Sequence, residues 1–339
     1  MGLMHAAIDT MAIGPVLAAD VGGTHARVGL VQVEPAGGLS LQAYQTYDCA
    51  EHVGLDDVLA RFLATLDGRR VDDVVVASAG HVQPDGTLVA ANLAWPVSLA
   101  GLRSTLGIAR SRLINDFVAL AHARHDADRH TLLHLCGPAG PTPGPVLLLG
   151  PGTGLGAALR IPRGEGALVL PTEAGQAAWA ANDAREIQVL QRLKAQRSHV
   201  PVEAVLSGPG LLAVYRALCE LDGCVAHHNT PAAVSAAGLD GGDALAREAV
   251  QMFCAVLGSV AGDMAMTCGA TGGVCLAGGL LPHLRDFLPH SRFVARFLDK
   301  GPMRPVLEGI PVRLLDHGQL GVLGAAGWYL AQAGQANSY

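Results

Sequence analysis

The first regular pattern in the chain consists of two short apolar runs separated by glycines. In "VLAADVGGTHARVGLV", apolar stretches at Val16–Asp20 and Ala26–Val33 lie on either side of the turn Gly22–Gly23. Two such runs joined by glycines predict a pair of antiparallel strands. In Leu39–Tyr47, apolar and polar residues alternate, which predicts a third strand. We therefore expect the chain to open with an antiparallel sheet.

Helical and strand-like segments then follow one another to residue 123. Apolar residues recur at helical spacing in some segments and form short continuous runs in others. The pattern predicts helices at Leu55–Leu66, Val97–Leu106 and Phe117–Ala123, with strands at Val71–Ala77 and Ser111–Asn115.

The second half begins with a glycine- and proline-rich segment, Leu133–Pro145, which predicts a loop or linker. A second strand, turn and strand unit follows at Val146–Pro162, and its similarity in plan to the first hints at a duplicated architecture. Gly272–Leu284 predicts a buried strand, a pair of glycines and a helix. Helices are expected at Ala184–Arg197, Gly210–Leu221, Asp243–Cys268 and Gln319–Ala333.

Length and composition favour an α/β enzyme with two domains. The chain has 339 residues, of which 50% are apolar and 15% are charged. The formal net charge of −6, without any run of Lys and Arg, argues against nucleic acid as a partner. Asp, Arg, Pro or Gly interrupts each apolar segment, so we expect no membrane partner and no membrane span.

The N-terminus and the cysteines favour a cytoplasmic protein. No Lys or Arg precedes the first apolar stretch, which Asp9 and Pro15 interrupt, so a secretory signal is not expected. The seven cysteines contain no CxxC pair and fit a reducing compartment. Cys219 and Cys224 lie near two histidines, but a second paired ligand set for zinc is missing from the sequence.

Two glycine loops are candidates for phosphate binding, because glycine lets backbone amides approach a ligand closely. Asp20–Thr24 taken alone also fits a plain hairpin turn. Gly150–Gly156 has four glycines and Thr153 in seven residues, which is more than a short hairpin needs. A Walker motif is excluded, since the chain contains no Gly-Lys-Ser/Thr. A dinucleotide fingerprint is disfavoured, because a strand-like segment rather than a helix follows the loop.

Polar residues of a second kind could bind a substrate rich in hydroxyl groups. In "LINDF", Asn115 and Asp116 could cap a helix, or Asp116 could take a proton from a substrate hydroxyl beside a positioning amide. Glu173, Gln176 and Glu203 could be solvated surface residues or substrate ligands. Asn92, in "AANLAW", could equally be a turn residue.

Taken together, these motifs resemble the bacterial glucokinase family of the sugar kinase, heat-shock ATPase and actin superfamily. The resemblance spans nearly the whole chain and keeps the family's order. It rests on "DVGGTHAR", "NLAW", "INDF", "GPGTGLG", "LPTEAGQ", "EAVLSGPGLLAVYRAL", "GGVCLAGGLLP" and "DKGPM".

The resemblance implies a two-domain, actin-like ATPase fold (ribonuclease H-like) with a cleft between a small and a large α/β domain. The small domain would comprise 15–116 plus 319–335, and the large domain 117–318, after an N-terminal extension at 1–14. The implied activity is ATP:hexose 6-phosphotransferase, a reaction of glycolysis that converts D-glucose to glucose 6-phosphate with ATP and Mg²⁺. A cytoplasmic homodimer is also implied.

Residue roles follow from the same resemblance. Asp116 matches the catalytic base, and Asp20 lies where the family places a residue near magnesium. The matches for the first phosphate loop are Asp20, Gly22, Gly23 and Thr24; those for the second are Gly150, Gly152, Thr153 and Gly154; Gly278 and Gly279 match the adenosine element. The residues implied in sugar binding are Asn92, Asn115, Asp116, Glu173, Gln176 and Glu203.

The chain departs from the family pattern at two positions. Gln176 stands where the family usually has a histidine that touches the sugar, and His25 replaces a usual asparagine. An amide can still donate and accept hydrogen bonds, but Gln176 leaves the sugar specificity open. A kinase of another hexose or of an amino sugar is therefore one alternative. A catalytically weak sugar-sensing protein is a second, from a different functional class. The related repressor and kinase family is disfavoured, since its zinc-binding cysteine cluster has no counterpart in the sequence.

Overall fold

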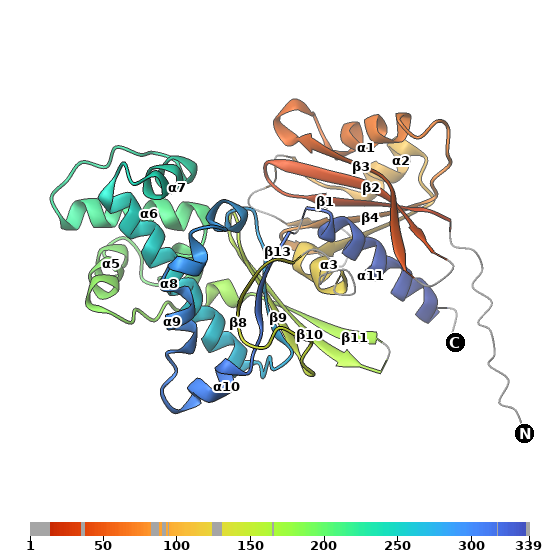
Figure 1. Ribbon diagram of the computed structural model, residues 1–339. Coiled ribbons are helices and arrows are strands. Elements are labelled where there is room, and N and C mark those ends of the chain that lie inside the picture. The colour runs from red at the N-terminus through yellow and green to blue at the C-terminus, as the bar shows by residue number, and fades with distance from the viewer. Residues whose placement is uncertain are drawn as a thin grey trace, which may run out of the picture. The chain divides into compact units, whose positions relative to one another are not determined.

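The computed structural model describes residues 14–34, 38–82, 88–89, 93, 95–123, 131–164, 166–316 and 318–336. The chain divides into two units, Met1–His122 with Gly321–Tyr339, and Ala123–Leu320 (Figure 1). The C-terminal helix therefore belongs to the same unit as the N-terminal strands. Each unit is built on a sheet of its own.

The first unit contains a five-stranded sheet in the order β3-β2-β1-β4-β7. The first three strands in the chain pair antiparallel, whereas β1, β4 and β7 run parallel. The strands are β1 (Val16–Val21), β2 (His25–Val33), β3 (Leu39–Asp48), β4 (Asp73–Ser78) and β7 (Arg110–Asn115), and a separate two-stranded ribbon pairs β5 (His81–Val82) with β6 (Leu88–Val89). The helices are η1 (Cys49–Glu51), α1 (Leu55–Ala64), α2 (Leu99–Leu106), α3 (Asp116–His122) and α11 (Leu320–Ala336).

Helices cover both faces of this sheet, and successive residues of β1 point to opposite faces. Leu17 and Ala19 belong to a core cluster with α1 and α2, whereas Val16 and Ala18 pack with α3 and α11. Burial of both faces explains why β1 is a continuous apolar run rather than an alternating one. Ala119 of α3 packs in the second of these clusters, so α3 belongs to the first unit.

The second unit contains a six-stranded sheet in the order β11-β10-β9-β12-β13-β8. Its strands are β8 (Thr131–Cys136), β9 (Val146–Pro151), β10 (Leu155–Arg163), β11 (Gly166–Thr172), β12 (Gly273–Leu276) and β13 (Val312–Leu315). The α-helices are α5 (Ala184–Lys194), α6 (Gly208–Leu221), α7 (Pro231–Asp240), α8 (Ala244–Thr267), α9 (Phe293–Leu298) and α10 (Arg304–Glu308). Short 3₁₀ helices are η2 (Ala174–Gln176), η3 (Val202–Ala204), η4 (Leu281–Leu284), η5 (Leu288–His290) and η6 (Gly301–Met303).

The two sheets share one plan. In each, an antiparallel meander of three strands is extended by strands parallel to the first of them: β1 is followed by β4 and β7, and β9 by β12 and β13. The duplicated architecture that the two glycine turns suggested is therefore present in the topology of the strands.

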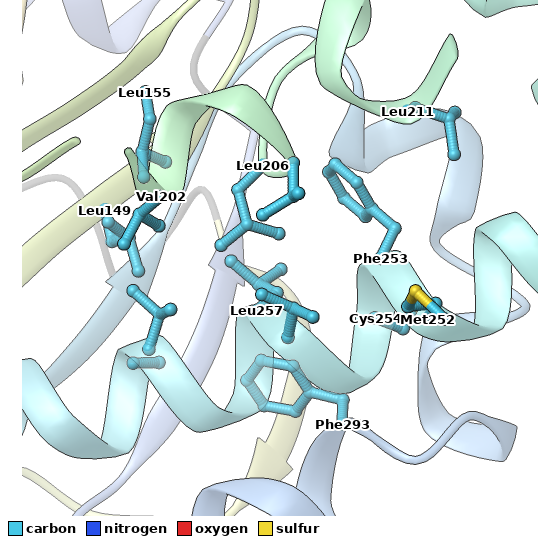
Figure 2. Close-up of a cluster of buried hydrophobic side chains, with 14 of the residues drawn as sticks. Leu149, Leu155, Val202, Leu206, Leu211, Met252, Phe253, Cys254, Leu257 and Phe293 are labelled. Atoms are coloured by element: carbon cyan, nitrogen blue, oxygen red, sulfur yellow. The ribbon is translucent and has the colours of Figure 1, made fainter. Parts of the chain in front are cut away.

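Helix α8 runs through the core of the second unit. Phe253, Cys254 and Leu257 are buried along it, and Figure 2 shows this helix among the apolar side chains of the cluster. By length and composition, α8 is the only helix in the described part of the chain that could span a bilayer, but 78% of its apolar window is buried inside the protein. Such burial is typical of a core helix.

One buried ion pair fixes helices α5, α8 and α9 together. Arg296 donates to Glu186 at 2.7 Å and to the Ser259 hydroxyl at 2.9 Å. The side chains of Arg296 and Glu186 are only 4% and 1% exposed. A buried charge is tolerated only when it is paired, so this pair constrains how the three helices pack.

A second polar network joins three elements of the first unit. Asp73 of β4 accepts hydrogen bonds from Arg110 of β7 and from the Tyr329 hydroxyl of α11. Burial raises the pKa of Asp73, but these hydrogen bonds and the Arg110 charge outweigh it and hold the pKa below its usual value. The network therefore stabilises the charged carboxylate.

Two expectations from the sequence need correction. The segment 133–145 is not wholly a loop, because β8 occupies Thr131–Cys136 and pairs antiparallel with β13. The helix expected near residue 284 is only the 3₁₀ turn η4. Strand β13 and helix α7 were not predicted. Strands β8 and β13 are short, and their pairing involves residues far apart in sequence, which a local pattern does not reveal.

Candidate functional site

The predicted site residues of the first unit lie at the carboxyl edge of its parallel strands. Asp20 is the penultimate residue of β1, and the last residues of β1, β4 and β7 are in register: Val21 pairs with Ser78, and Ser78 with Asn115. Asp116 follows at the start of α3. The structure therefore brings Asp20, Asn115 and Asp116 to one edge, the edge at which open α/β sheets bind ligands.

The turn between β1 and β2 is supported from beneath by Cys49. The Cys49 amide donates to the Thr24 carbonyl at 2.8 Å, and its thiol lies 3.5 Å from the Gly22 carbonyl. Burial raises the pKa of the Cys49 thiol, which keeps this donor protonated. Thr24 and His25 are exposed. Strands β1 and β2 form a hairpin in which the Gly22 amide donates to the His25 carbonyl at 3.0 Å. Gly22 is not in the left-handed region, so the backbone of this turn does not by itself require glycine at position 22.

Asp20 occupies a position that only a neighbouring glycine allows. Asp20 is 8% exposed. Its carboxylate lies 3.4 Å from the Arg27 guanidinium and beside Gly321, in the first turn of α11. A Cβ at Gly321 would lie 2.5 Å from Asp20 Oδ2. The positive end of the helix dipole and the Arg27 guanidinium both favour the charged carboxylate. Gly321 was not identified from the sequence, since its role depends on a residue 301 positions away in the chain.

Asn115 caps helix α3. Its Oδ1 accepts hydrogen bonds from the amides of Phe117 at 3.0 Å and Val118 at 3.2 Å. Asp116 Oδ1 also accepts from the Phe117 amide, at 2.9 Å. Because Asn115 provides the cap, the half-buried Asp116 carboxylate is not required for it. The capping interpretation thus applies to Asn115 and leaves Asp116 as the candidate for chemistry.

The predicted glycine loops of the second unit also lie at one sheet edge. Gly152–Gly154 follows β9, and Gly278–Gly279 follows the adjacent parallel strand β12. Gly278 has a φ of +110°, and a Cβ there would lie 2.5 Å from the Pro151 carbonyl oxygen, so only glycine fits. By contrast, a Cβ at Gly152 would meet nothing within 4 Å. The loop therefore leaves open space at Gly152, where a ligand can approach the backbone.

An acidic and an amide side chain meet beside this loop. Glu203 Oε2 accepts a hydrogen bond from the Leu155 amide at 2.8 Å, and Gln176 Nε2 donates to Glu203 Oε1 at 3.2 Å. Glu173 is exposed and directly precedes the short helix η2 that carries Gln176, but its side chain makes no capping hydrogen bond. His199, which was not predicted, contacts the Gln176 carbonyl at 2.9 Å and so helps to hold η2. Glu203 and Gln176 thus form a pair next to the glycine loop.

Glycine at position 175 allows η2 to approach strand β10. A Cβ at Gly175 would lie 2.7 Å from the Leu155 carbonyl oxygen. The close packing holds Gln176 within reach of Glu203. The sequence contained a signal for this residue, since Gly175 lies inside the quoted motif "LPTEAGQ", but not for its structural reason.

Asn92 lies outside the described residues, so its contact with the sugar stays a prediction. Among the described residues, no group of three or more His, Cys, Asp or Glu side chains is arranged to hold a metal ion. A divalent ion bound here would therefore need ligands besides protein carboxylates, as Mg²⁺ commonly takes from substrate phosphates.

Comparison with known proteins identifies the family. The model of the glucokinase family matches residues 17–332. A glucokinase-like protein of Xylella fastidiosa (strain Temecula1) is 50% identical over 95% of this chain and 96% of its own. A glucokinase of Chromobacterium violaceum is 40% identical over 89% of this chain and 85% of its own.

A solved structure agrees with these relatives. The crystal structure of a glucokinase from an Antarctic psychrotroph superimposes with a TM-score of 0.80 at 30% identity, covering 94% of this chain and 99% of that one. The similarity therefore extends over both units, each with its carboxyl-edge site residues. The chain belongs to the glucokinase family, a family of sugar kinases.

Proposed function

We propose that the protein transfers the γ-phosphoryl group of ATP to the C6 hydroxyl of D-glucose, giving glucose 6-phosphate and ADP. The observation that carries the proposal is the repeated arrangement of the two sheets. Each unit has a glycine turn after its first parallel strand, with acidic and amide side chains at or beside the same edge. One such edge suits a polyphosphate, and the side chains suit sugar hydroxyls.

Asp116 is the proposed general base. As the C6 oxygen attacks the γ-phosphorus, its proton passes to the Asp116 carboxylate, and the bond from the γ-phosphorus to the bridging oxygen breaks to release ADP. Asn115, which caps α3 directly before Asp116, would fix the position of that carboxylate relative to strand β7. The backbone amides of the two glycine loops would offset negative charge on the phosphate oxygens.

Asp20 would hold magnesium through water. Its position beside Gly321 and Arg27, at the edge where β1 ends, leaves a single carboxylate for the ion. Mg²⁺ usually keeps several waters and binds one or two carboxylates together with substrate phosphates, so the donor set fits. The ion would supply charge neutralisation at the phosphates.

The arrangement of the two units belongs to the proposal as well. The family resemblance implies the actin-like ATPase fold, in which the two carboxyl edges would act on one sugar and one nucleotide. It also implies a cytoplasmic location and a homodimer. Gel filtration with light scattering would test the dimer.

A coupled assay of hexose phosphorylation tests the function. ATP, Mg²⁺ and the protein are incubated with glucose, mannose, fructose or glucosamine in turn, and ADP formation is followed. We expect the highest kcat/KM with glucose. A higher kcat/KM with another sugar would identify a kinase of that sugar, an alternative favoured by the Gln176 amide that contacts Glu203. Binding of glucose without turnover of any sugar would indicate a sugar-sensing protein.

A further inference from the structure

Gly154 has an environment that phosphate binding alone does not explain. Its backbone is not left-handed, yet a Cβ there would lie 2.5 Å from Glu203 Oε2 and 3.3 Å from Glu203 Cδ. The space of the missing side chain is therefore filled by the Glu203 carboxylate. Gly152, two residues earlier in the same loop, has no atom within 4 Å of its Cβ position. The two glycines of one motif are therefore required for different physical reasons.

The Glu203 carboxylate is held at both oxygens. Oε2 accepts from the Leu155 amide, directly after Gly154, and Oε1 accepts from Gln176. Each carboxylate oxygen can accept two hydrogen bonds, so the group keeps capacity for a sugar hydroxyl. Only a residue without a side chain at position 154 lets the carboxylate reach the Leu155 amide.

Core packing and a hydrogen bond fix the backbone of Glu203. Its neighbours Val202 and Leu206 are buried in the core cluster that includes Leu149 and Leu155, as Figure 2 shows. The Ser207 hydroxyl donates to the Glu203 carbonyl at 2.8 Å. Because the backbone is anchored, a clash at position 154 is relieved by moving the carboxylate.

We propose that Gly154 is a positioning residue for the sugar: it is glycine so that Glu203 can bond to the Leu155 amide and present its remaining acceptor sites to sugar hydroxyls. The proposal rests on the proposed function, in which Glu203 binds the sugar. It reassigns Gly154 from the phosphate loop, where the sequence motif placed it, to the sugar site. Gly152, whose Cβ position has no atom within 4 Å, stays in the phosphate loop of the proposed function.

The substitution Gly154→Ala separates these roles. The new Cβ would lie 2.5 Å from Glu203 Oε2, which is shorter than a normal contact between a Cβ and an oxygen. The carboxylate is the flexible end of the Glu203 side chain, so it can move to relieve the clash. The carboxylate would move away, losing the Leu155 bond, while the loop backbone stays in place. Gly175→Ala is not a substitute, because its Cβ would meet the Leu155 main chain at 2.7 Å.

The experiment measures glucose and a magnesium-bound non-hydrolysable ATP analogue separately by calorimetric titration. For Gly154→Ala we expect the glucose Kd to rise at least about tenfold, the value of one hydrogen bond to a charged group. The analogue Kd should stay within about twofold. For Gly152→Ala we expect the reverse split. The exposed Gly242, also without neighbours within 4 Å, supplies Gly242→Ala as a control that binds both ligands like the wild type.

A double-mutant cycle distinguishes positioning from a general structural effect. If Gly154 acts through Glu203, then adding Gly154→Ala to Glu203→Ala should change the glucose Kd by less than about twofold. Additive effects, an unchanged glucose Kd in Gly154→Ala, or loss of analogue affinity in that variant would overturn the inference. Wild-type protein that binds no glucose would instead overturn the proposed function on which the inference rests.

Discussion

Replacing Asp116 by asparagine separates the proposed chemistry from the structural part of the same residue. The Asn side chain retains an oxygen at the position of Oδ1, which accepts from the Phe117 amide at 2.9 Å. The helix cap comes from Asn115, through two hydrogen bonds of 3.0 and 3.2 Å. Because no cap is lost, we expect the free energy of unfolding to change by less than about 1 kcal/mol.

The effect on the rate should be much larger. Loss of a general base reduces kcat by about 10² to 10⁴, which corresponds to about 2.7 to 5.4 kcal/mol of barrier at 1.36 kcal/mol for each factor of ten. The glucose KM should change little, because the amide oxygen remains an acceptor and the other sugar ligands are intact. The coupled assay gives kcat and KM, and urea unfolding gives the stability.

The exposed Asp240 at the end of α7 offers a matched control, since it lies on no predicted site element. Asp240→Asn should retain the wild-type kcat. A kcat near the wild-type value in Asp116→Asn, with the protein folded, would refute the assignment of Asp116 as the base. A parallel loss of kcat and of stability would show that the residue acts through the fold.

Three further predictions concern stability and the Asp20 site. Glu186→Gln should lower the free energy of unfolding in urea by about 3 kcal/mol, because it removes the carboxylate nearest to the buried Arg296 guanidinium and leaves only Asp183, at 3.7 Å, as a charged partner. The stabilising effect of Asp73 should be present above its unfolded pKa of about 3.9 and be lost as the pH falls towards its lower folded pKa, so Asp73→Asn should flatten the acid limb of the stability profile. Gly321→Ala should raise the Mg²⁺ concentration needed for half-maximal activity, because its Cβ would lie 2.5 Å from Asp20 Oδ2.

Each of these has a matched comparison. Glu308→Gln, which breaks an exposed pair with Arg304, should cost no more than about 0.5 kcal/mol. Above pH 6, the free energy of unfolding should depend on pH in the same way for the wild type and Asp73→Asn. Identical slopes of the two proteins at acid pH would contradict the role of Asp73. In the same helix as Gly321, a Cβ at Gly327 would lie 3.4 Å from Leu39 and 3.8 Å from the His122 carbonyl oxygen, which are ordinary contacts, so Gly327→Ala should leave the Mg²⁺ requirement unchanged. An equal response of the two glycines would contradict the contact with Asp20.

Much of the local structure was predictable from the sequence. The strands around Gly22 and after Val146, and the helices near Leu55, Ala184 and Ala244, occur within a few residues of their predicted positions. Their apolar periodicity is strong because each buries one or both faces. The strands β8 and β13 escaped prediction, because a strand of four to six residues at or near a sheet edge depends on a partner distant in the chain.

The candidate site divides in the same way. The motifs identified which residues carry carboxylates, amides and glycines, and the carboxyl edges of the two sheets gather them within each unit. The motifs did not show that Asn115 caps α3 while Asp116 is the candidate base. They also did not show that Gly152 and Gly154 have different surroundings. Those distinctions depend on which atoms lie within 3 Å, and sequence spacing does not encode such distances.

The sequence by itself determined the family, the two-sheet α/β class and the chemical types at the site, because these depend on residue identity and on the period of burial. Only the tertiary structure decided that Glu203 fills the space beside Gly154 and that Asp20 fills the space beside Gly321. Both contacts join residues far apart in the chain. The requirement for glycine at each position is imposed by a carboxylate that folding places against it.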